Sequence, residues 1–398
     1  MIEICPKIDC VGCGACLSAC NHAAILMIPD KLGFLYPVIN QEKCIDCGLC
    51  AKSCFNNENA EYREPISTCV GHAVDKNEQL SSTSGGLASV FIRTILENRG
   101  IVYACSGTNA KDVKHIRVDR LEDINKLKGS KYVQSYMDKT CKFVVQDLKD
   151  DKKVLFVGTP CQVAGLKAYL KGKVYPNLFT VDFVCHGVPS QHILNSAIES
   201  KLKYSDGLTL VNRVKEKGKE SKYSLRLIQS EKIVYDQTYP SLGYITGFLS
   251  GLFYRENCYR CKFAKRERIS DITLGDFWDR NNNVMNLPNK ADGLSMIMVN
   301  SENGCKLMND SKDSYISVNW NYEDFIKRNG QLQKSISRHA KRDQFEELFC
   351  SKGFEYALNI TLTSTLRSIK KRVFFNEVAS LLSYVPYLRK IYNKVKNR

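Results

Sequence analysis

Hydrophobic positions between residues 69 and 300 fall into short runs that alternate with amphipathic stretches. Three β-branched runs bounded by glycine predict buried strands at residues 100–105, 153–158 and 178–185. Stretches with helical spacing precede or follow these runs, and they cover residues 86–98, 139–148 and 162–170. This alternation predicts an α/β domain built on a mixed or parallel sheet.

A different pattern occupies residues 208–239, where apolar side chains fall on alternating positions in polar surroundings. These side chains are Val211, Tyr223, Leu225, Leu227, Ile233 and Tyr235. The alternation predicts antiparallel strands with one buried face. From about residue 331 onward the sequence is helical in pattern and basic, which predicts a helical C-terminal tail.

The first 60 residues are dense in cysteine and short turns, and they contain an internal repeat. Cys10-x2-Cys13-x2-Cys16-x3-Cys20 recurs as Cys44-x2-Cys47-x2-Cys50-x3-Cys54. Two-residue gaps let one tight loop place three thiolates at three corners of a [4Fe-4S] cubane, and the fourth cysteine starts a helix that crosses to the other cluster. The first cysteine set is therefore Cys10, Cys13, Cys16 and Cys54, and the second cysteine set is Cys44, Cys47, Cys50 and Cys20.

Two other uses of cysteine compete with this assignment. Disulfide frameworks belong to small secreted domains, whereas this chain has 398 residues and 18 cysteines. A zinc site takes four ligands and rarely uses the triple spacing. We therefore predict two [4Fe-4S] clusters, although Asn21 and Phe55 stand where proline usually follows the fourth cysteine.

The length of the chain indicates two or three domains. We expect a two-cluster ferredoxin-type domain at residues 1–62, an α/β domain at 66–330 and a basic helical region at 331–398, with residues 61–67 as a linker. The N-terminus has no basic region followed by an apolar core, and no run of 18 uncharged apolar residues occurs. We therefore expect a cytoplasmic protein whose cysteines are thiols or thiolate ligands.

The formal net charge is +16, and much of it lies in the last third of the chain. Solvated surface lysines explain such a charge, and so does contact with nucleic acid, an anionic membrane or an acidic protein. No nucleic-acid partner is expected, because the basic residues lack interleaved aromatic motifs or a recognisable binding fold. The basic tail at 364–398 has two interpretations: a helix that covers the domain, or a peripheral helix on an anionic membrane.

Three further stretches stand out: Ser81-Ser-Thr-Ser-Gly-Gly86 at a helix start, Gly129-Ser-Lys-Tyr-Val-Gln-Ser135, and a scattered set of cysteines. A serine- and glycine-rich helix start suits a phosphate, although a plain N-cap is the commoner explanation. The strings TSGG, GSKYVQS, GTPCQVAGL, CHGVPS and DITLGDFW occur in this order. Together they resemble the beta subunit of coenzyme F420 hydrogenase/dehydrogenase over roughly residues 65–300, a family whose members look like flavoproteins with FAD and iron–sulfur clusters.

The resemblance implies roles for particular residues. Ser84, Gly85 and Gly86 would cradle the FAD pyrophosphate, and Lys131, Tyr132 and Gln134 would lie near the flavin, with Lys131 also a candidate catalytic residue and a surface lysine as the alternative. His186 is a candidate proton donor or a hydrogen-bonded structural residue, and Asp276 would orient the loop of Cys258. The third cysteine set would hold a third [4Fe-4S] cluster, with buried structural thiols, or a zinc site for Cys258 and Cys261, as the alternatives; it consists of Cys161, Cys185, Cys258 and Cys261. The remaining cysteines, Cys5 among them, lack ligand spacing and are expected to be packed thiols.

The fold expected from these observations is an α+β ferredoxin-like two-cluster module, an α/β mixed-sheet flavin domain and a helical C-terminal tail. The resemblance implies an oxidoreductase that takes electrons from a redox donor such as ferredoxin and passes them through the clusters and FAD to a small-molecule substrate. That substrate would be a deazaflavin or a pathway intermediate, and some bacterial members of the family occur in polysaccharide biosynthesis. The alternative is an electron-carrier subunit without a catalytic site of its own.

Overall fold

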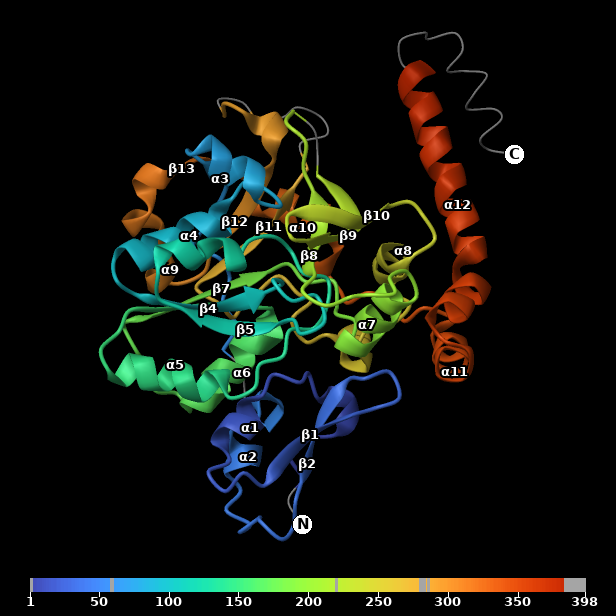
Figure 1. Cartoon of the computed structure of the whole chain (residues 1–398). Helices are drawn as coiled ribbons and strands as arrows, with labels where there is room; N and C mark the ends of the chain where they lie inside the picture. The colour runs from blue at the N-terminus through green and yellow to red at the C-terminus, as the bar shows by residue number, and fades with distance from the viewer. Residues whose placement is uncertain (1–2, 58–60, 219–220, 279–283, 285–286, 383–398) are drawn as a thin grey trace.

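The computed structural model describes residues 3–57, 61–218, 221–278, 284 and 287–382, with the backbone alone for residues 372–382. The N-terminal module lies at one end of the molecule, beneath a larger α/β body (Figure 1). The tail beyond residue 382, where much of the predicted membrane contact falls, lies outside the described residues. Among the described helices, none combines the length and hydropathy needed to cross a membrane.

The N-terminal module has a pseudo-twofold layout. Its hairpin pairs β1 (Ile25–Pro29) with antiparallel β2 (Leu35–Ile39), and its two short helices are α1 (Ala15–Ala19) and α2 (Leu49–Lys52). Each helix begins after a glycine with a positive φ, 73° at Gly14 and 69° at Gly48, a backbone conformation that glycine adopts without strain. The repeat in the cysteine motif therefore reappears as a repeat in the backbone.

The body is built on one eight-stranded mixed sheet. Its parallel core comprises β4, β6, β7 and β11, and antiparallel neighbours flank that core on both sides. In sheet order the strands are β13 (Tyr315–Asn319), β3 (Ser67–Ala73), β12 (Leu294–Val299), β11 (Ile272–Phe277), β7 (Leu178–Phe183), β6 (Val154–Val157), β4 (Ile101–Ser106) and β5 (Lys114–Val118). The predicted mixed sheet is confirmed, and the three predicted strand runs are β4, β6 and β7.

Helices cover both faces of this sheet. α4 and α9 pack on one face, while α5 and α6 pack on the other, next to the N-terminal module (Figure 1). The helices of the body are α3 (Lys76–Ser81), α4 (Leu87–Glu97), α5 (Thr140–Lys149), α6 (Pro160–Leu170), α7 (Gln191–Glu199), α8 (Tyr244–Leu249), α9 (Glu302–Asp310) and α10 (Tyr322–Arg328). Three of them, α4, α5 and α6, are the helices that the sequence predicts beside the strands.

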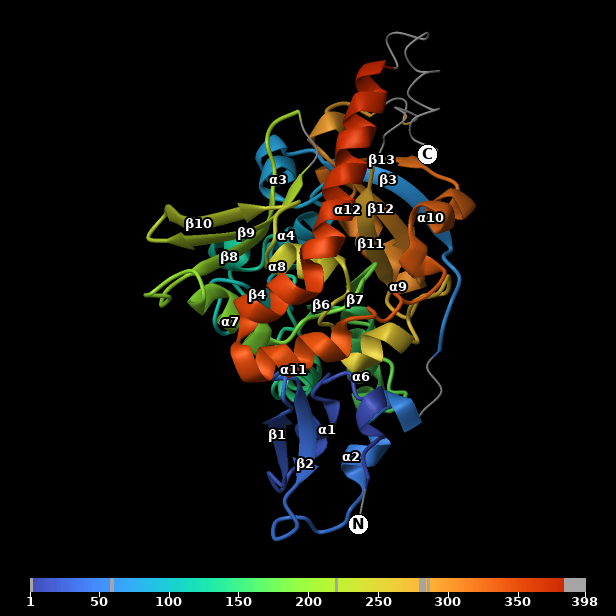
Figure 2. The ribbon, with the colours of Figure 1, turned by 90° about the vertical axis from the view of Figure 1, so that its right-hand side faces the viewer.

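A second layer carries the segment of alternating side chains. The predicted antiparallel strands are confirmed as β8 (Thr209–Val214), β9 (Lys222–Gln229) and β10 (Lys232–Thr238), which form a separate three-stranded sheet. The expected helical tail consists of α11 (Arg342–Lys352) and the long α12 (Phe354–Leu382), which rises along the side of the body (Figure 2). α12 packs on α7 and α8, so its first half covers the domain.

Short 3-10 helices connect these elements. They are η1 (Lys7–Asp9), η2 (Phe55–Asn57), η3 (Leu121–Lys126), η4 (Glu256–Arg260), η5 (Lys290–Asp292), η6 (Lys312–Ser314) and η7 (Gly330–Leu332). The predicted linker is partly anchored, because Arg63 pairs with Arg268 through backbone hydrogen bonds and Ile66 donates to Val299.

Candidate electron-transfer site

The first cysteine set surrounds a pocket between α1, the hairpin and η2. Cys10, Cys13, Cys16 and Cys54 all line this pocket, whose cavity volume is about 20 Å³. Cys54 comes from the second copy of the repeat, so the crosswise grouping expected from the motif matches the geometry. The pocket is mostly apolar, as the burial of an iron–sulfur cluster requires.

Backbone N–H groups point at the sulfurs of this set. The amides of Gly12, Ala15 and Asn56 donate to Cys10, Cys13 and Cys54, respectively. Hydrogen bonds to the sulfurs are one of the levers that set the potential of an iron–sulfur cluster. The donor set and the surrounding N–H groups therefore fit a cubane.

Cys5 also lines this pocket, which the sequence did not indicate. Its thiol donates hydrogen bonds to Cys10 and Cys54, and these bonds lower the pKa of Cys10 to about 6 and that of Cys54 to about 7. Cys5 is a packed thiol, as expected, and it also lies beside the first set. Its spacing from Cys10 follows no ligand motif, and only the fold brings it to the pocket.

The second cysteine set is more exposed to solvent than the first. Cys50 is within electrostatic range of Cys20 and Cys44, and Cys47 is exposed to solvent. The second set thus differs from the first set in burial, because all four cysteines of the first set are buried. The described residues contain no group of three His, Cys, Asp or Glu side chains arranged around a single metal-ion position.

The module contacts the body through the first set. A Cβ placed on Gly165 of α6 would come within 2.6 Å of both Cβ and Sγ of Cys13, so only glycine allows α1 to pack this closely on α6. Gln134, which the family resemblance places near a flavin, instead donates from Nε2 to the Val11 carbonyl at 2.8 Å. Gly12 lies against the same amide, with a positive φ of 68°. The string GSKYVQS therefore contributes to the interface with the module.

The third cysteine set gathers residues from three loops at one end of the sheet. Cys161 is at the start of α6, Cys185 follows β7, and Cys258 and Cys261 lie in and directly after η4. Cys185 lies within electrostatic range of the other three thiols. Burial raises the pKa of all four, to about 11 for Cys161 and about 12 for Cys258. A raised pKa favours the neutral thiol, and a bound metal would favour the thiolate.

Each of these thiols also has a hydrogen-bond donor. Cys185 accepts from the Gly187 amide, Cys258 from the Val188 amide, and Cys261 from the amides of residues 263 and 264. Thr159 is the N-cap of α6, and its hydroxyl oxygen lies 3.1 Å from the sulfur of Cys161. The pattern of N–H and O–H donors around four convergent sulfurs repeats that of the first set.

One polar atom beside the third set lacks a partner. The hydroxyl of Tyr254 is buried and makes no hydrogen bond to any described residue. It lies in the electrostatic range of Cys185 and Cys258, and its ring packs against Gly187. A buried hydroxyl without a partner is costly, and an acceptor such as the sulfide of a cluster would satisfy it. The third set therefore also fits a cubane.

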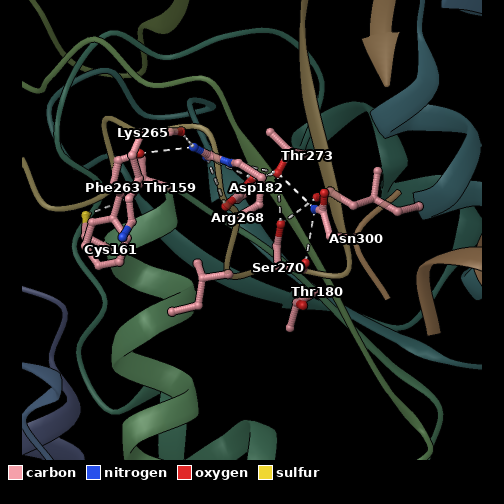
Figure 3. A network of polar contacts seen from close by, with 12 residues as sticks. Thr159, Cys161, Thr180, Asp182, Phe263, Lys265, Arg268, Ser270, Thr273 and Asn300 are labelled. Atoms are coloured by element: carbon pink, nitrogen blue, oxygen red, sulfur yellow. Dashed lines mark hydrogen bonds and ion pairs between the residues drawn. The ribbon is translucent and has the colours of Figure 1, made fainter. Parts of the chain in front are cut away.

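A buried network holds the loop that carries Cys258 and Cys261 (Figure 3). Arg268 donates from Nη1 to the Phe263 carbonyl at 3.0 Å and the Lys265 carbonyl at 3.3 Å, while Nη2 lies 3.4 Å from the carboxylate of Asp182. Asp182 accepts a hydrogen bond from Thr273 at 2.5 Å, and burial raises its pKa. The cysteine loop is thereby tied to β7 and β11.

Asp276 has a different role from the expected one of orienting this loop. Its carboxylate accepts a hydrogen bond from Arg213 Nη1 at 2.7 Å, and the same nitrogen donates to the hydroxyl of Tyr132 at 3.2 Å. The guanidinium of Arg213 lies over the rings of Tyr223 and Trp278, at 4.2 and 5.1 Å from their centroids. Arg213 is not among the predicted site residues, because its only signal in the sequence is a charge within a strand of alternating apolar residues.

Other predicted site residues lie near Arg213 and Asp276. His186 is in the electrostatic range of Asp276, although desolvation lowers its pKa overall. Ser84 donates to the Leu294 carbonyl, and the Gly85 amide donates to Ser295 at 3.0 Å, so both polar groups are engaged with β12. Lys215 donates to the Ser84 carbonyl, and burial lowers its pKa to about 8.

Lys131 is anchored in the fold. Its Nζ lies 3.0, 2.8 and 2.9 Å from the carbonyls of Cys105, Leu127 and Lys128. An ammonium group has three hydrogens, so these contacts use all of them. Burial lowers the pKa of Lys131. The arrangement favours a structural role in this conformation, and the proposed contact with a flavin remains a prediction.

Arg255 contacts both the first set and the third set. Arg255 is the N-cap of η4, which carries Cys258, and its guanidinium donates to Cys10 of the first set. The three sets therefore form a series from the exposed end of the module, through the module's contact with the body, to the loops at the end of the sheet. This is an arrangement suited to moving electrons along the chain.

Comparisons with known proteins match two parts of the chain to family models. Residues 151–320 match the family model for the C-terminal part of the coenzyme F420 hydrogenase/dehydrogenase beta subunit, and residues 9–57 match the 4Fe-4S dicluster domain. Among solved structures, the chain is similar to one in the F420-reducing [NiFe] hydrogenase complex from Methanosarcina barkeri. That likeness has 16% identity and a TM-score of 0.45, and it covers 75% of this chain and 91% of the other. No curated protein sequence matches. The chain thus combines a 4Fe-4S dicluster domain near its N-terminus with a region, residues 151–320, that matches the C-terminal part of the coenzyme F420 hydrogenase/dehydrogenase beta subunit.

Proposed function

We propose that the chain is an iron–sulfur flavoprotein oxidoreductase, which takes electrons from a ferredoxin-type donor and delivers them to a small organic substrate. The observation that carries the proposal is the series of three cysteine sets, linked at Cys10 and Cys258 by Arg255. The two sets in the module would hold [4Fe-4S] clusters, and the third set would hold another. Four convergent thiols with N–H donors support the assignments of the first and third sets.

The burial of the sets gives the proposed order of transfer. The donor would meet the second set, because Cys47 is exposed and Ile45 beside it is 62% exposed. The first set lies between the second set and the body, since Cys13 packs on α6. The third set lies in the body itself, beside Tyr254 and Tyr132, which are in electrostatic range of each other.

The region around Arg213 and Asp276 is the proposed place for FAD. Bound FAD would supply the conversion between single-electron transfer and hydride transfer. Lys215 and Arg213 provide positive charge beside the 84–86 loop, which suits an anionic pyrophosphate at the start of α4. Tyr132 offers a ring that is already stacked on Phe248 at 4.4 Å between centroids. Ser84 and Gly85 would contribute through the shape of the loop, because their own donors are engaged with β12.

His186 is the proposed proton donor to the substrate. It lies in the electrostatic range of the Asp276 carboxylate, which acts to raise its pKa and thereby favours the protonated ring. The substrate would be a deazaflavin or an intermediate of a biosynthetic pathway such as that of a polysaccharide. The protein donor of electrons and FAD would therefore bind at opposite ends of the series of cysteine sets.

The test is anaerobic purification followed by iron and flavin analysis. Three cubanes correspond to about twelve iron atoms per chain, and Cys161→Ser is expected to lower the number to about eight. Cys305→Ser, which changes a cysteine outside all three sets, is the control and should leave the iron content unchanged. An unchanged iron content in Cys161→Ser would remove the third cluster from the proposal.

A substrate screen with dithionite-reduced protein separates catalysis from simple conduction. The proposed oxidoreductase should bind FAD and reoxidise in the presence of a suitable substrate. Protein that binds no FAD, even when FAD is added, would instead support the carrier-subunit function, in which electrons pass to a partner enzyme.

A further inference from the structure

Arg255 is the most buried large charged side chain at the boundary between the module and the body. It is 1% exposed. Its Nε donates to the Cys10 carbonyl at 2.7 Å, and Nη2 donates to the Leu35 carbonyl at 2.9 Å. Nη1 donates to Gln134 Oε1 at 3.2 Å, and Nη2 also lies 3.4 Å from the sulfur of Cys10. The side chain therefore reaches from the body into the first cysteine set.

The positive charge of Arg255 has no carboxylate partner among the described residues. Its hydrogen bonds go to two carbonyl groups, an amide and a thiol. A buried charge is costly unless an opposite charge compensates it. The source of negative charge that Arg255 contacts would be the first set itself, whose four thiolates give a bound cubane a net negative charge. The guanidinium of Arg255 would contact the cluster through the sulfur of Cys10.

The backbone of Arg255 forms hydrogen bonds with residues beside the third cysteine set. Its N–H donates to the Val188 carbonyl at 2.9 Å, and its own carbonyl accepts from the Cys258 N–H at 2.8 Å. The amide of Val188 in turn donates to the sulfur of Cys258. The positive charge of Arg255 interacts electrostatically with Cys161 and Cys258 as well as with Cys10. One residue therefore influences both the first and the third set.

Aromatic rings of the module enclose the guanidinium. It lies 4.2 Å from the ring centroid of Tyr36 and 5.7 Å from that of Phe34. These rings exclude water, and a lower effective dielectric strengthens the action of a charge on its neighbours. An exposed arginine at the same boundary would be screened.

We propose that Arg255 sets the reduction potential of the first cluster, and to a smaller extent that of the third, by stabilising the extra negative charge of the reduced state. Reduction adds one electron and therefore one negative charge to a cluster, while the charge of Arg255 stays fixed. A fixed positive charge at the Cys10 sulfur favours the reduced form and raises the potential. Arg255 is thus a positioning residue that draws electrons from the outer cluster into the body. The inference rests on the proposed cluster in the first set and holds whether or not FAD is bound.

The experiment compares three variants of the full chain by EPR-monitored redox titration, with iron analysis of each sample. Arg255→Gln removes the charge and keeps polar atoms, whereas Arg255→Lys keeps the charge and loses the forked contacts. Arg260→Gln is the matched control, because Arg260 is in the same η4 helix and also binds the module, through Asp9 at 3.1 Å, but is 53% exposed. The signal that Cys10→Ser abolishes identifies the first cluster.

Arg255→Gln is expected to lower the equilibrium constant for reduction of the first cluster at least tenfold, which is 59 mV for one electron. Arg255→Lys should stay within about threefold of the unmodified protein, and Arg260→Gln should leave the potential unchanged. An unchanged potential in Arg255→Gln at full iron content would overturn the proposal. Equal shifts in Arg255→Gln and Arg255→Lys would also overturn it, because contact geometry rather than charge would then be responsible.

If Arg255→Gln loses iron and its potential cannot be measured, a second variant tests the proposal. Gln134→Glu would place a carboxylate beside Nη1, where the amide oxygen now lies at 3.2 Å, and would neutralise Arg255 without removing it. The same lowering of the potential is expected, and its absence would count against the proposal. An iron content of about eight would remove the third cluster from the proposed function, and the measurement on the first cluster would still stand.

Discussion

Replacing Arg268 with methionine should destabilise the protein, because it leaves the carboxylate of Asp182 buried without its cation. Asp182 is fully buried and the Arg268 side chain is 2% exposed. Breaking a buried ion pair on one side costs about 3–5 kcal/mol. The N–O distances of 3.4 and 3.5 Å are longer than those of a tight charged pair, and burial already raises the pKa of Asp182, so we expect about 3 kcal/mol.

The assay is anaerobic thermal unfolding followed by circular dichroism. A loss of about 3 kcal/mol corresponds to a fall of about 6–12 °C in the unfolding midpoint for a domain of this size. Arg266→Met is the control, because Arg266 belongs to the same loop and pairs with Glu323 at the surface. It should change the midpoint by a small fraction of that amount.

The double variant Arg268→Met with Asp182→Asn tests the mechanism. It removes the uncompensated charge and keeps an oxygen that can accept from Thr273, so it should recover at least half of the lost stability. Arg268 also holds the carbonyls of residues 263 and 265, so Arg268→Met should release iron from the third set to a chelator faster. A midpoint in Arg268→Met equal to that of the control would refute the reasoning.

Three further outcomes are expected. Burial lowers the pKa of His115 to about 4, so its contribution to stability is complete above about pH 6.5 and is lost as the pH falls toward 4. The loss between pH 7.5 and 5.5 is about 1.3 kcal/mol, which His115→Gln should abolish in unfolding measured across this range. Gly165→Val should cost about 1–3 kcal/mol in denaturant unfolding through its clash with Cys13, whereas Gly330→Ala, which meets no neighbour, should be neutral. Deleting residues 364–398 should leave binding to anionic vesicles unchanged, and a loss of binding in a flotation assay would support the membrane interpretation of the tail.

The parts of the molecule that the sequence predicted depend on local patterns. The repeated cysteine spacing predicts the grouping around the first pocket, because short loops leave few other placements for three thiols. The strands β4, β6 and β7 follow from β-branched runs bounded by turns, and the β8–β10 sheet follows from alternation. In each case the pattern lies within a short stretch of the chain.

The contacts that the sequence could not predict join residues far apart. Arg255 binds Cys10 across 245 positions, and Gln134 binds Val11 across 123. No spacing rule connects such pairs, and an arginine before a Cys-x2-Cys turn is equally consistent with a surface residue. The contact of Cys5 with Cys54 is of the same kind, because Cys54 comes from the other half of the repeat.

The shared core between the module and the body bears on how the module works. Val11, Cys13, Ala15 and Phe55 of the module belong to one hydrophobic cluster with side chains of α5, α6 and the Cys261 loop. A hydrophobic interface of this kind opposes the relative motion that is the default between domains. A ferredoxin that shuttles must leave its partner, whereas here the first cysteine set is packed against the body by Gly165 and held by Arg255. The module is therefore better described as a fixed entrance to the body than as a mobile carrier.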